Sequence, residues 1–182
     1  LSKPKTLARF LFALRILHIG EATAKTLAAW LGSLEYIRQA PAAVLGVLPV
    51  LGEEVATSIE AFFAQPGNEK AVDELLGRGV RLVDEATPSP RLRGKLNLAS
   101  LLIAAKISGI ADVRANLLAN EFATMDSLIE AKAGGMQSGL FSMDGAVKNK
   151  VEVELSAFLS VPANQEKMRR WETYMHRILA AI

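Results

Sequence analysis

Residues 18–25 have the sequence HIGEATAK and interrupt a pattern of helical periodicity. Ahead of them, apolar side chains follow the i, i+3, i+4 and i+7 spacing of one helix face, at Leu7, Phe10, Leu11 and Leu14. Gly20 lets the chain turn sharply, and Ala24 is small enough for close packing of a following helix. The stretch therefore predicts two helices joined by a tight turn.

The helical pattern occurs twice in the chain. The first stripe returns at Leu98, Leu101, Leu102 and Ala105, displaced by 91 positions (98 minus 7). The displacement holds without a gap through pairs such as Ile16/Ile107 and Ala24/Ala115. From Val55/Val151 onward the displacement is 96, so the second copy has gained five residues (96 minus 91) within 132–149.

The turn around Gly20 matches part of a helix-hairpin-helix motif, in which apolar-Gly-apolar-Gly joins two helices. His18 stands at the first glycine position and Gly20 at the second. Glycine lets such a turn approach a phosphate, and the amides at the next helix N-terminus bind the anion. These contacts do not depend on the bases. The candidate DNA-binding residues here are Ile19, Gly20, Glu21, Ala22, Thr23 and Lys25.

The next turn of the first copy keeps only the second glycine of the motif. Gly52 is retained, while Val50 replaces the first glycine. Glu53 and Glu54 suit a helix N-terminus but repel DNA where a phosphate would come. Gly52 joins the candidate DNA-binding residues, and we expect the first hairpin to be the stronger contact.

The turns of the second copy match the motif less completely. Gly109 keeps the first glycine, and Arg114 follows in the next helix. The last turn, near residues 142–147, keeps Gly145 and has Lys148 and Lys150 close by. We include Gly109, Arg114, Lys148 and Lys150 as candidate DNA-binding residues, although these turns could instead serve only to hold helices together.

Each of these features also has a purely structural interpretation. Glycine followed by alanine is common wherever two helices pack at a turn, and Lys148 and Lys150 would usually belong to a solvated face. We expect His18 to be a partly buried turn residue and not a catalyst, because no cluster of His, Cys or carboxylates accompanies it. Trp30 and Trp171 are expected in the core.

The fold class that we expect is all-α, with two tandem helix-hairpin-helix units of short helices. Residues 1–83 form the first unit, residues 84–96 a linker with two prolines, and residues 97–182 a second, degenerate unit. Helices of the first unit are predicted to be capped or started by Ser33, Pro41, Gly52 and Asn68, and those of the second to begin near Asn97, Ala111, Thr124, Asp144 and Asn164.

Composition limits the functions that this chain can have. Lys and Arg number 21 against 19 Asp and Glu, so the net charge of +2 does not by itself imply a polyanionic partner. The absence of cysteine excludes disulfides, a thiol nucleophile and cysteine-bound zinc within these 182 residues. We expect a cytoplasmic protein without a membrane span. Because the sequence starts at Leu1, we also expect it to be part of a longer polypeptide.

Four blocks of the first copy closely resemble bacterial NAD-dependent DNA ligases: LARFLFAL at 7–14, HIGEATAK at 18–25, GSLE at 32–35 and SIEAFF at 58–63. The resemblance covers about residues 3–83 and corresponds to the third and fourth hairpins of the family's helix-hairpin-helix domain. It implies that this region closes around nicked duplex DNA and contacts the minor-groove side through backbone amides. Other domains of such ligases bind NAD and transfer AMP.

Carried over by position, the resemblance assigns hairpin amides to residues 20–23, with Lys25 nearby, and a next hairpin to residues 52–54. Arg15 and Val50 stand where the family usually has glycine. The family's Lys-x-Asp-Gly adenylation signature is absent, since residues 142–145 are SMDG, and so is its four-cysteine zinc module. The usual α/β domain that follows this region is replaced by a helical pattern.

We therefore expect the C-terminal, non-catalytic DNA-binding region of an NAD-dependent DNA ligase, which binds duplex DNA without sequence specificity and supports nick sealing in replication and repair. No catalytic residue, metal site or cofactor is predicted in this chain, and NAD would bind elsewhere in the parent enzyme. Its partners would be nicked duplex DNA and the rest of the ligase polypeptide. The alternative is a helical interaction module derived from a ligase, which self-associates or binds a partner protein through the second copy.

Overall fold

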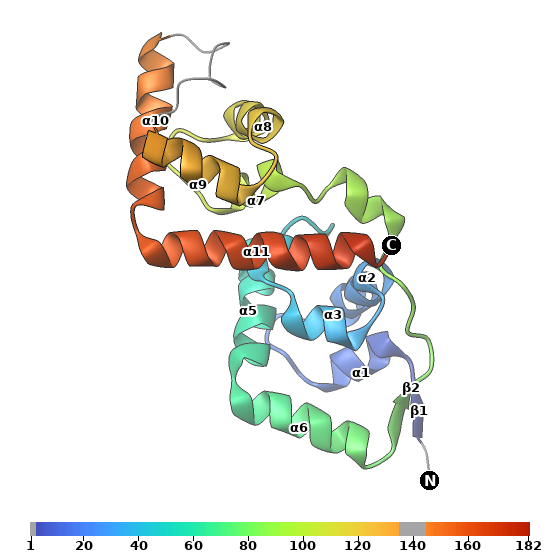
Figure 1. Ribbon diagram of the computed structural model, residues 1–182. Helices are drawn as coiled ribbons and strands as arrows, with labels where there is room; N and C mark the ends of the chain where they lie inside the picture. The colour runs from blue at the N-terminus through green and yellow to red at the C-terminus, as the bar shows by residue number, and fades with distance from the viewer. Residues whose placement is uncertain (1–2, 135–144) are drawn as a thin grey trace. The chain divides into compact units, whose positions relative to one another are not determined.

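The computed structural model describes residues 3–134 and 145–182, without the side chains of residues 132–134, 147 and 148. The contacts among the described residues divide them into two units. The first unit contains the chain through Arg93 together with His176–Ile182, and the second contains Gly94–Met175. The described part holds eleven α-helices, one 3-10 helix and two strands of three residues each, which confirms the all-α class (Figure 1).

The first unit has six helices between two short strands. In chain order these elements are β1 (Lys3–Lys5), α1 (Leu7–Ala13), α2 (Glu21–Leu31), α3 (Leu34–Gln39), α4 (Ala42–Leu45), α5 (Glu53–Ala64), α6 (Pro66–Gly77) and β2 (Val80–Leu82). The strands pair in parallel, with Lys3 opposite Val80 and Lys5 opposite Leu82. The sequence does not predict this pairing, because strands of three residues are too short to show an alternating pattern.

The core of the first unit forms from the apolar faces that the periodicity predicted. Leu7, Phe10 and Leu11 of α1 are buried, and Leu27 of α2 is fully enclosed. Each large aliphatic side chain buried in this way contributes about 1.5–3 kcal/mol. Trp30 is also buried, which confirms its predicted place in the core.

The second unit follows a 3-10 helix (Pro90–Gly94) and contains α7 (Leu98–Ala104), α8 (Asp112–Glu121), α9 (Met125–Gly134), α10 (Gly145–Leu159) and most of α11 (Pro162–Ala180). Helices α7, α8 and α9 begin 91 positions after α1, α2 and α3, at 98, 112 and 125 against 7, 21 and 34. The backbone thus matches the displacement seen in the sequence. Trp171 is buried as expected.

Several of the predicted helix starts are confirmed by capping contacts. The Ser33 hydroxyl accepts a hydrogen bond from the amide of Tyr36, and Gly52 is the N-cap of α5. Asn97 forms a capping box with Ser100 at the start of α7. The predicted start near Asp144 lies outside the described residues.

The predicted cap Asn68 is wrong, whereas the helix predicted to begin near Asn164 is found. Helices α6 and α11 begin two residues earlier, at Pro66 and Pro162, because proline is already set for the first helical position. The two asparagines make equivalent contacts in the two copies: Asn68 donates to the Phe62 carbonyl at 3.0 Å, and Asn164 donates to the Phe158 carbonyl at 2.9 Å. Each of these bonds adds a second donor to a carbonyl in the last turn of the preceding helix, which also accepts from the amide of Gln65 or Val161.

Residues 84–93, which fall in the predicted linker 84–96, lie against the first unit. The Asp84 carboxylate accepts from the Leu7 amide at 2.7 Å, and the Glu85 carboxylate accepts from the Leu34 amide at 2.7 Å. The Ala86 amide donates to the Gly32 carbonyl, and Leu92 is fully buried. This segment therefore caps α1 and α3. The second unit starts at Gly94, compared with the predicted boundary of 97, and ends at Met175.

Candidate nucleic-acid interface

The turn between α1 and α2 is a hairpin with two residues in the left-handed region. Arg15 has φ 55° and His18 has φ 65°, conformations that glycine adopts most easily. Ile16 and Ile19 are buried and anchor the turn to the helices, and the Ile19 amide donates to the Ile16 carbonyl at 3.1 Å. The turn is therefore held by apolar side chains, although non-glycine residues occupy its left-handed positions.

The N-terminus of α2 presents a set of open backbone amides. The first bond within this helix turn runs from the Ala24 amide to the Gly20 carbonyl at 3.0 Å. Among the residues that the structure describes, no group accepts a hydrogen bond from the amides of residues 20–23. Gly20, Glu21 and Ala22 are exposed and Thr23 is half-buried. The Ile19 amide, predicted as part of this set, is not available, because it is already bonded within the turn.

The fold itself does not require glycine at position 20. Gly20 has φ −94° and ψ −177°, which is extended backbone open to any residue. A Cβ atom added there would meet nothing within 4 Å. The missing side chain instead leaves the amides of α2 accessible to an approaching group, and a helix N-terminus with open amides is suited to an anion.

Lys25 does not stand alone at this hairpin. Its Nζ atom lies 3.0 Å from Glu21 Oε1, a pair at the i, i+4 spacing of α2. The hydrogen bond and the charge of Lys25 lower the pKa of the Glu21 carboxyl, with a smaller contribution from Arg9. Part of the positive charge that Lys25 brings to the hairpin is therefore balanced by Glu21.

The second hairpin of this unit, between α4 and α5, lies next to the first. Val50 has φ 60°, at the position where the motif has its first glycine, and Gly52 is the N-cap of α5. His18 Nε2 of the first hairpin lies 3.1 Å from Glu54 Oε1 of the second. The sequence does not reveal this contact, because no local pattern links residues so far apart in the chain.

The hairpin between α7 and α8 keeps the backbone of the first hairpin. Lys106 has φ 54° and Gly109 has φ 75°, which are the positions of Arg15 and His18 displaced by 91. Ala111, in place of Gly20, is the N-cap of α8 with an extended backbone. Alanine fits at this position because extended backbone is open to any residue, as it is at position 20.

The structure brings together three predicted residues of the second unit. Arg114 Nη1 donates to the Gly109 carbonyl at 2.5 Å. A Cβ atom on Gly109 would lie 3.5 Å from Arg114 Nη1 and 3.8 Å from Lys150 Cε, so Lys150 of α10 reaches the same turn. The side chain of Lys148 lies outside the described residues. Positive charge thus gathers at this hairpin from two helices.

Neither a metal site nor a membrane-spanning helix is found within the described ranges. Within residues 3–134 and 145–182, no group of three or more His, Asp or Glu side chains could hold a metal ion. None of the helices described there has the length and apolar character to cross a membrane. The hairpins are the features on which we base the function.

These hairpins define the class of protein. Two helices joined by a tight turn, with a left-handed residue before an exposed helix N-terminus, form a helix-hairpin-helix motif. Residues 9–72 match the family described as "Helix-hairpin-helix motif". This range contains both hairpins of the first unit.

The relatives of the chain are bacterial DNA ligases. It is 42% identical over 182 residues to the DNA ligase of Xanthomonas axonopodis pv. citri, covering 100% of this chain and 21% of the relative. The DNA ligase of Xanthomonas oryzae pv. oryzae is 45% identical over 163 residues (90% of this chain, 19% of the relative), and that of Stenotrophomonas maltophilia is 45% identical over 134 residues (73% and 16%). The chain spans about a fifth of the length of these relatives. It belongs with the helix-hairpin-helix region of the bacterial DNA ligases.

Proposed function

We propose that this chain is a DNA-binding region of an NAD-dependent DNA ligase that holds duplex DNA through backbone phosphates at the α1–α2 hairpin. The open amides of residues 20–23, beside a Gly20 whose Cβ position is empty, carry this proposal. These amides can donate several hydrogen bonds to the oxygens of one phosphate, and the helix dipole adds to the attraction. The relatives named DNA ligase support the choice of nucleic acid as the anion.

The contribution to nick sealing is positioning. Phosphate contacts fix the place and orientation of a protein on the duplex without reading its sequence, so binding is independent of the base pairs. The adenylation chemistry and the NAD that it consumes would belong to other parts of the ligase polypeptide, which is the second partner of this region. Replication and repair, which both leave nicks, are the settings that we propose.

The Gly20→Ser variant tests the hairpin directly. Serine is at least as good an N-cap as glycine, so the folded chain should keep its stability or gain a few tenths of a kcal/mol. Its side chain would fill the open space and engage one of the amides. We expect about tenfold weaker binding of a fluorescein-labelled nicked duplex, measured by anisotropy, which corresponds to about 1.4 kcal/mol.

The matched control is Gly67→Ser, at an exposed glycine of α6 whose Cβ position is also empty. It should bind the duplex as the unaltered chain does. Binding must also weaken as salt rises, and Lys25→Gln should make the slope of log affinity against log salt shallower by about one unit. The proposal would be overturned if DNA affinity did not change with salt concentration, or if Gly20→Ser left that affinity unchanged.

A further inference from the structure

Two large apolar side chains are exposed at the tips of the two hairpins in the first unit. Leu17 precedes the left-handed residue of the α1–α2 turn and is 69% exposed. Val50 is itself the left-handed residue of the α4–α5 turn and is 70% exposed. We call Leu17 and Val50 the apolar tips.

Val50 is unfavourable for the folded chain in two ways. A β-branched residue at φ 60° is a conformational outlier, since its Cβ substituents crowd the backbone. The exposed side chain also gains little packing in return. Outliers of this kind concentrate at functional sites, where a binding partner can compensate for the strain.

The two tips belong to hairpins that meet through one side-chain contact. Leu17 adjoins His18, and His18 Nε2 lies 3.1 Å from Glu54 Oε1, four positions after Val50. The two hairpins thus differ in what they expose: the first has open amides and Lys25, and the second has an apolar residue near acidic residues. Glu54 disfavours a phosphate at the start of α5, so the second hairpin has to contact a nucleic acid by other chemistry.

We propose that Leu17 and Val50 pack against deoxyribose rings of the duplex, next to the phosphate held by the α1–α2 hairpin. This inference rests on the proposed function. Sugars lie between successive phosphates and are the apolar part of the DNA backbone that a protein can reach without reading bases. The apolar tips thereby add a contact that does not depend on ionic strength, whereas the open amides supply the contact that does.

Val50→Gly separates a DNA contact from a purely structural role, because it should change stability and DNA affinity in opposite directions. Glycine relieves the left-handed strain, so the thermal midpoint of the first unit should rise. The same change removes the apolar contact, so affinity for a nicked duplex should fall by about fivefold to tenfold. The loss should be the same at every salt concentration and for two duplexes of unrelated sequence.

Leu17→Ser is the second variant, and we expect a similar salt-independent loss. Val83→Thr is the control, because Val83 is 53% exposed in the same unit but belongs to neither hairpin. It should leave affinity unchanged. All measurements use the complete 182-residue chain.

The outcomes separate this inference from the proposed function. If the unaltered chain shows no salt-sensitive DNA binding, the proposed function fails and the inference fails with it. If Gly20→Ser weakens binding while Val50→Gly and Leu17→Ser do not, only the inference is overturned. Loss of self-association in Val50→Gly with unchanged DNA affinity would also overturn it, since the tips would then serve a protein contact.

Discussion

The α1–α2 and α7–α8 hairpins share a backbone and differ in chemistry. Both have left-handed residues at matching positions, such as His18 and Gly109, and both are anchored by buried isoleucines. The first hairpin has Gly20 where the second has Ala111, and each is an N-cap with an extended backbone. The buried isoleucines therefore preserve the backbone of the turn. The residue at the N-cap, Gly20 or Ala111, determines how closely a ligand can approach the helix amides.

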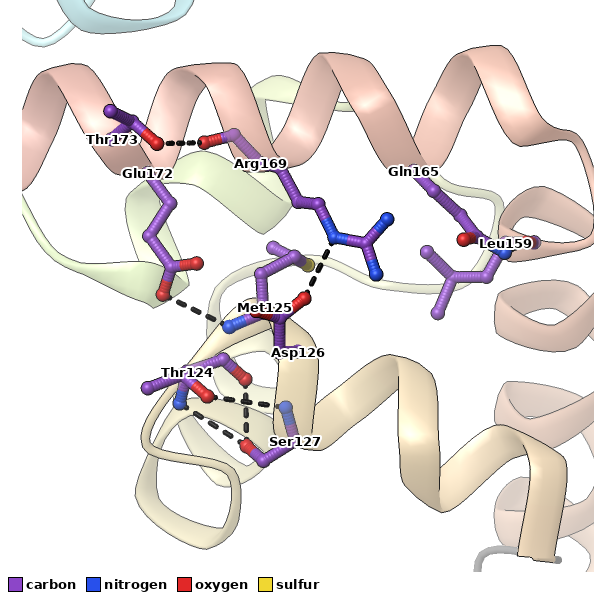
Figure 2. Close-up of polar contacts among 9 residues, drawn as sticks. All are labelled: Thr124, Met125, Asp126, Ser127, Leu159, Gln165, Arg169, Glu172 and Thr173. Atoms are coloured by element: carbon purple, nitrogen blue, oxygen red, sulfur yellow. Dashed lines mark hydrogen bonds and ion pairs between the residues drawn. The ribbon is translucent and has the colours of Figure 1, made fainter.

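The two units also cap equivalent helices with carboxylates from unrelated places. In the first unit, Glu85 of the 84–93 segment accepts from the Leu34 amide at the start of α3. In the second unit, Glu172 of α11 accepts from the Met125 amide at the start of α9, at 2.9 Å (Figure 2). Arg169 Nε of α11 donates to Asp126 Oδ1 at 2.7 Å, a bond that holds α11 beside this helix start and is also drawn in Figure 2. In both units an amide at the start of a helix needs an acceptor, but the carboxylate that accepts from it comes from a different part of the chain.

The largest expected effect comes from Gly32→Ala. Of the α1–α2 and α7–α8 hairpin regions, both of which the structure describes, only the first has a glycine with positive φ after its second helix. Gly32 has φ 79°, and a Cβ there would lie 2.3 Å from the Ala86 carbonyl oxygen. We expect the first unit to lose about 3 kcal/mol or more, from left-handed strain and a backbone clash together. Denaturation followed by Trp30 fluorescence in a Trp171→Phe background measures this loss.

Ala123 stands at the equivalent position of the second copy (32 plus 91), after α8, which ends at Glu121 and has Phe122 as an extended C-cap. Ala123→Gly should change the stability of the second unit by less than about 1 kcal/mol. Equal losses from the two substitutions would contradict this account of Gly32.

The two carboxylate caps give the next largest effect. Glu172 is buried, whereas Glu85 is exposed, so Glu172→Ala leaves the Met125 amide without its acceptor in a drier place. We expect Glu172→Ala to cost the second unit about 2–3 kcal/mol and Glu85→Ala to cost the first about 1 kcal/mol. Glu172→Gln keeps an oxygen acceptor and should lose less than Glu172→Ala. Urea denaturation of each variant would refute the comparison if the exposed cap proved the more costly one.

The left-handed positions predict a smaller difference between the hairpins. Gly109→Ala should cost the second unit about 1 kcal/mol, because its φ of 75° disfavours a side chain while the space around it does not. His18→Gly relieves the same conformation but gives up the contact with Glu54, so the first unit should change by less than about 0.5 kcal/mol. The thermal midpoints of both variants test this difference. Equal changes in the two units would contradict the account in which the buried isoleucines hold the turn.

The smallest expected effect concerns the Glu21–Lys25 pair, which the second copy replaces with Asp112 and Asn116. Lys25 lowers the pKa of Glu21, so the pair is complete above the usual carboxyl range and is lost as pH falls through the lowered pKa. Lys25→Gln should move the Glu21 titration to higher pH, as followed by NMR of the side-chain carboxyl. An unmoved titration would show that Lys25 does not reach Glu21 in solution.

Sequence was sufficient for the features that depend on local pattern. Periodicity predicted the helices, the displacement of 91 predicted matching turns, and the helix starts at Ser33 and near Asn97 were confirmed. The prediction of Asn68 as a cap was wrong because an asparagine near a helix start can bond backward to the preceding helix, as Asn68 and Asn164 both do.

The remaining features depend on contacts between distant residues. Nothing local marks Asp84 and Glu85 as caps, or His18 as a partner of Glu54, because each contact joins residues brought together only by folding. The occupied amide of Ile19 has a different cause. It results from the detailed path of the turn, which a motif written as residue types does not specify.

The path of residues 84–93 determines where this chain can be cut or joined. A fragment that stopped at residue 83 would lose the acceptors for the Leu7 and Leu34 amides and the donor to the Gly32 carbonyl. A cut after Arg93 would keep these contacts but would remove His176–Ile182, which also belong to the first unit. An exchanged second unit would therefore have to be inserted between Arg93 and His176, so that the first unit keeps both the capped helix ends and its C-terminal segment.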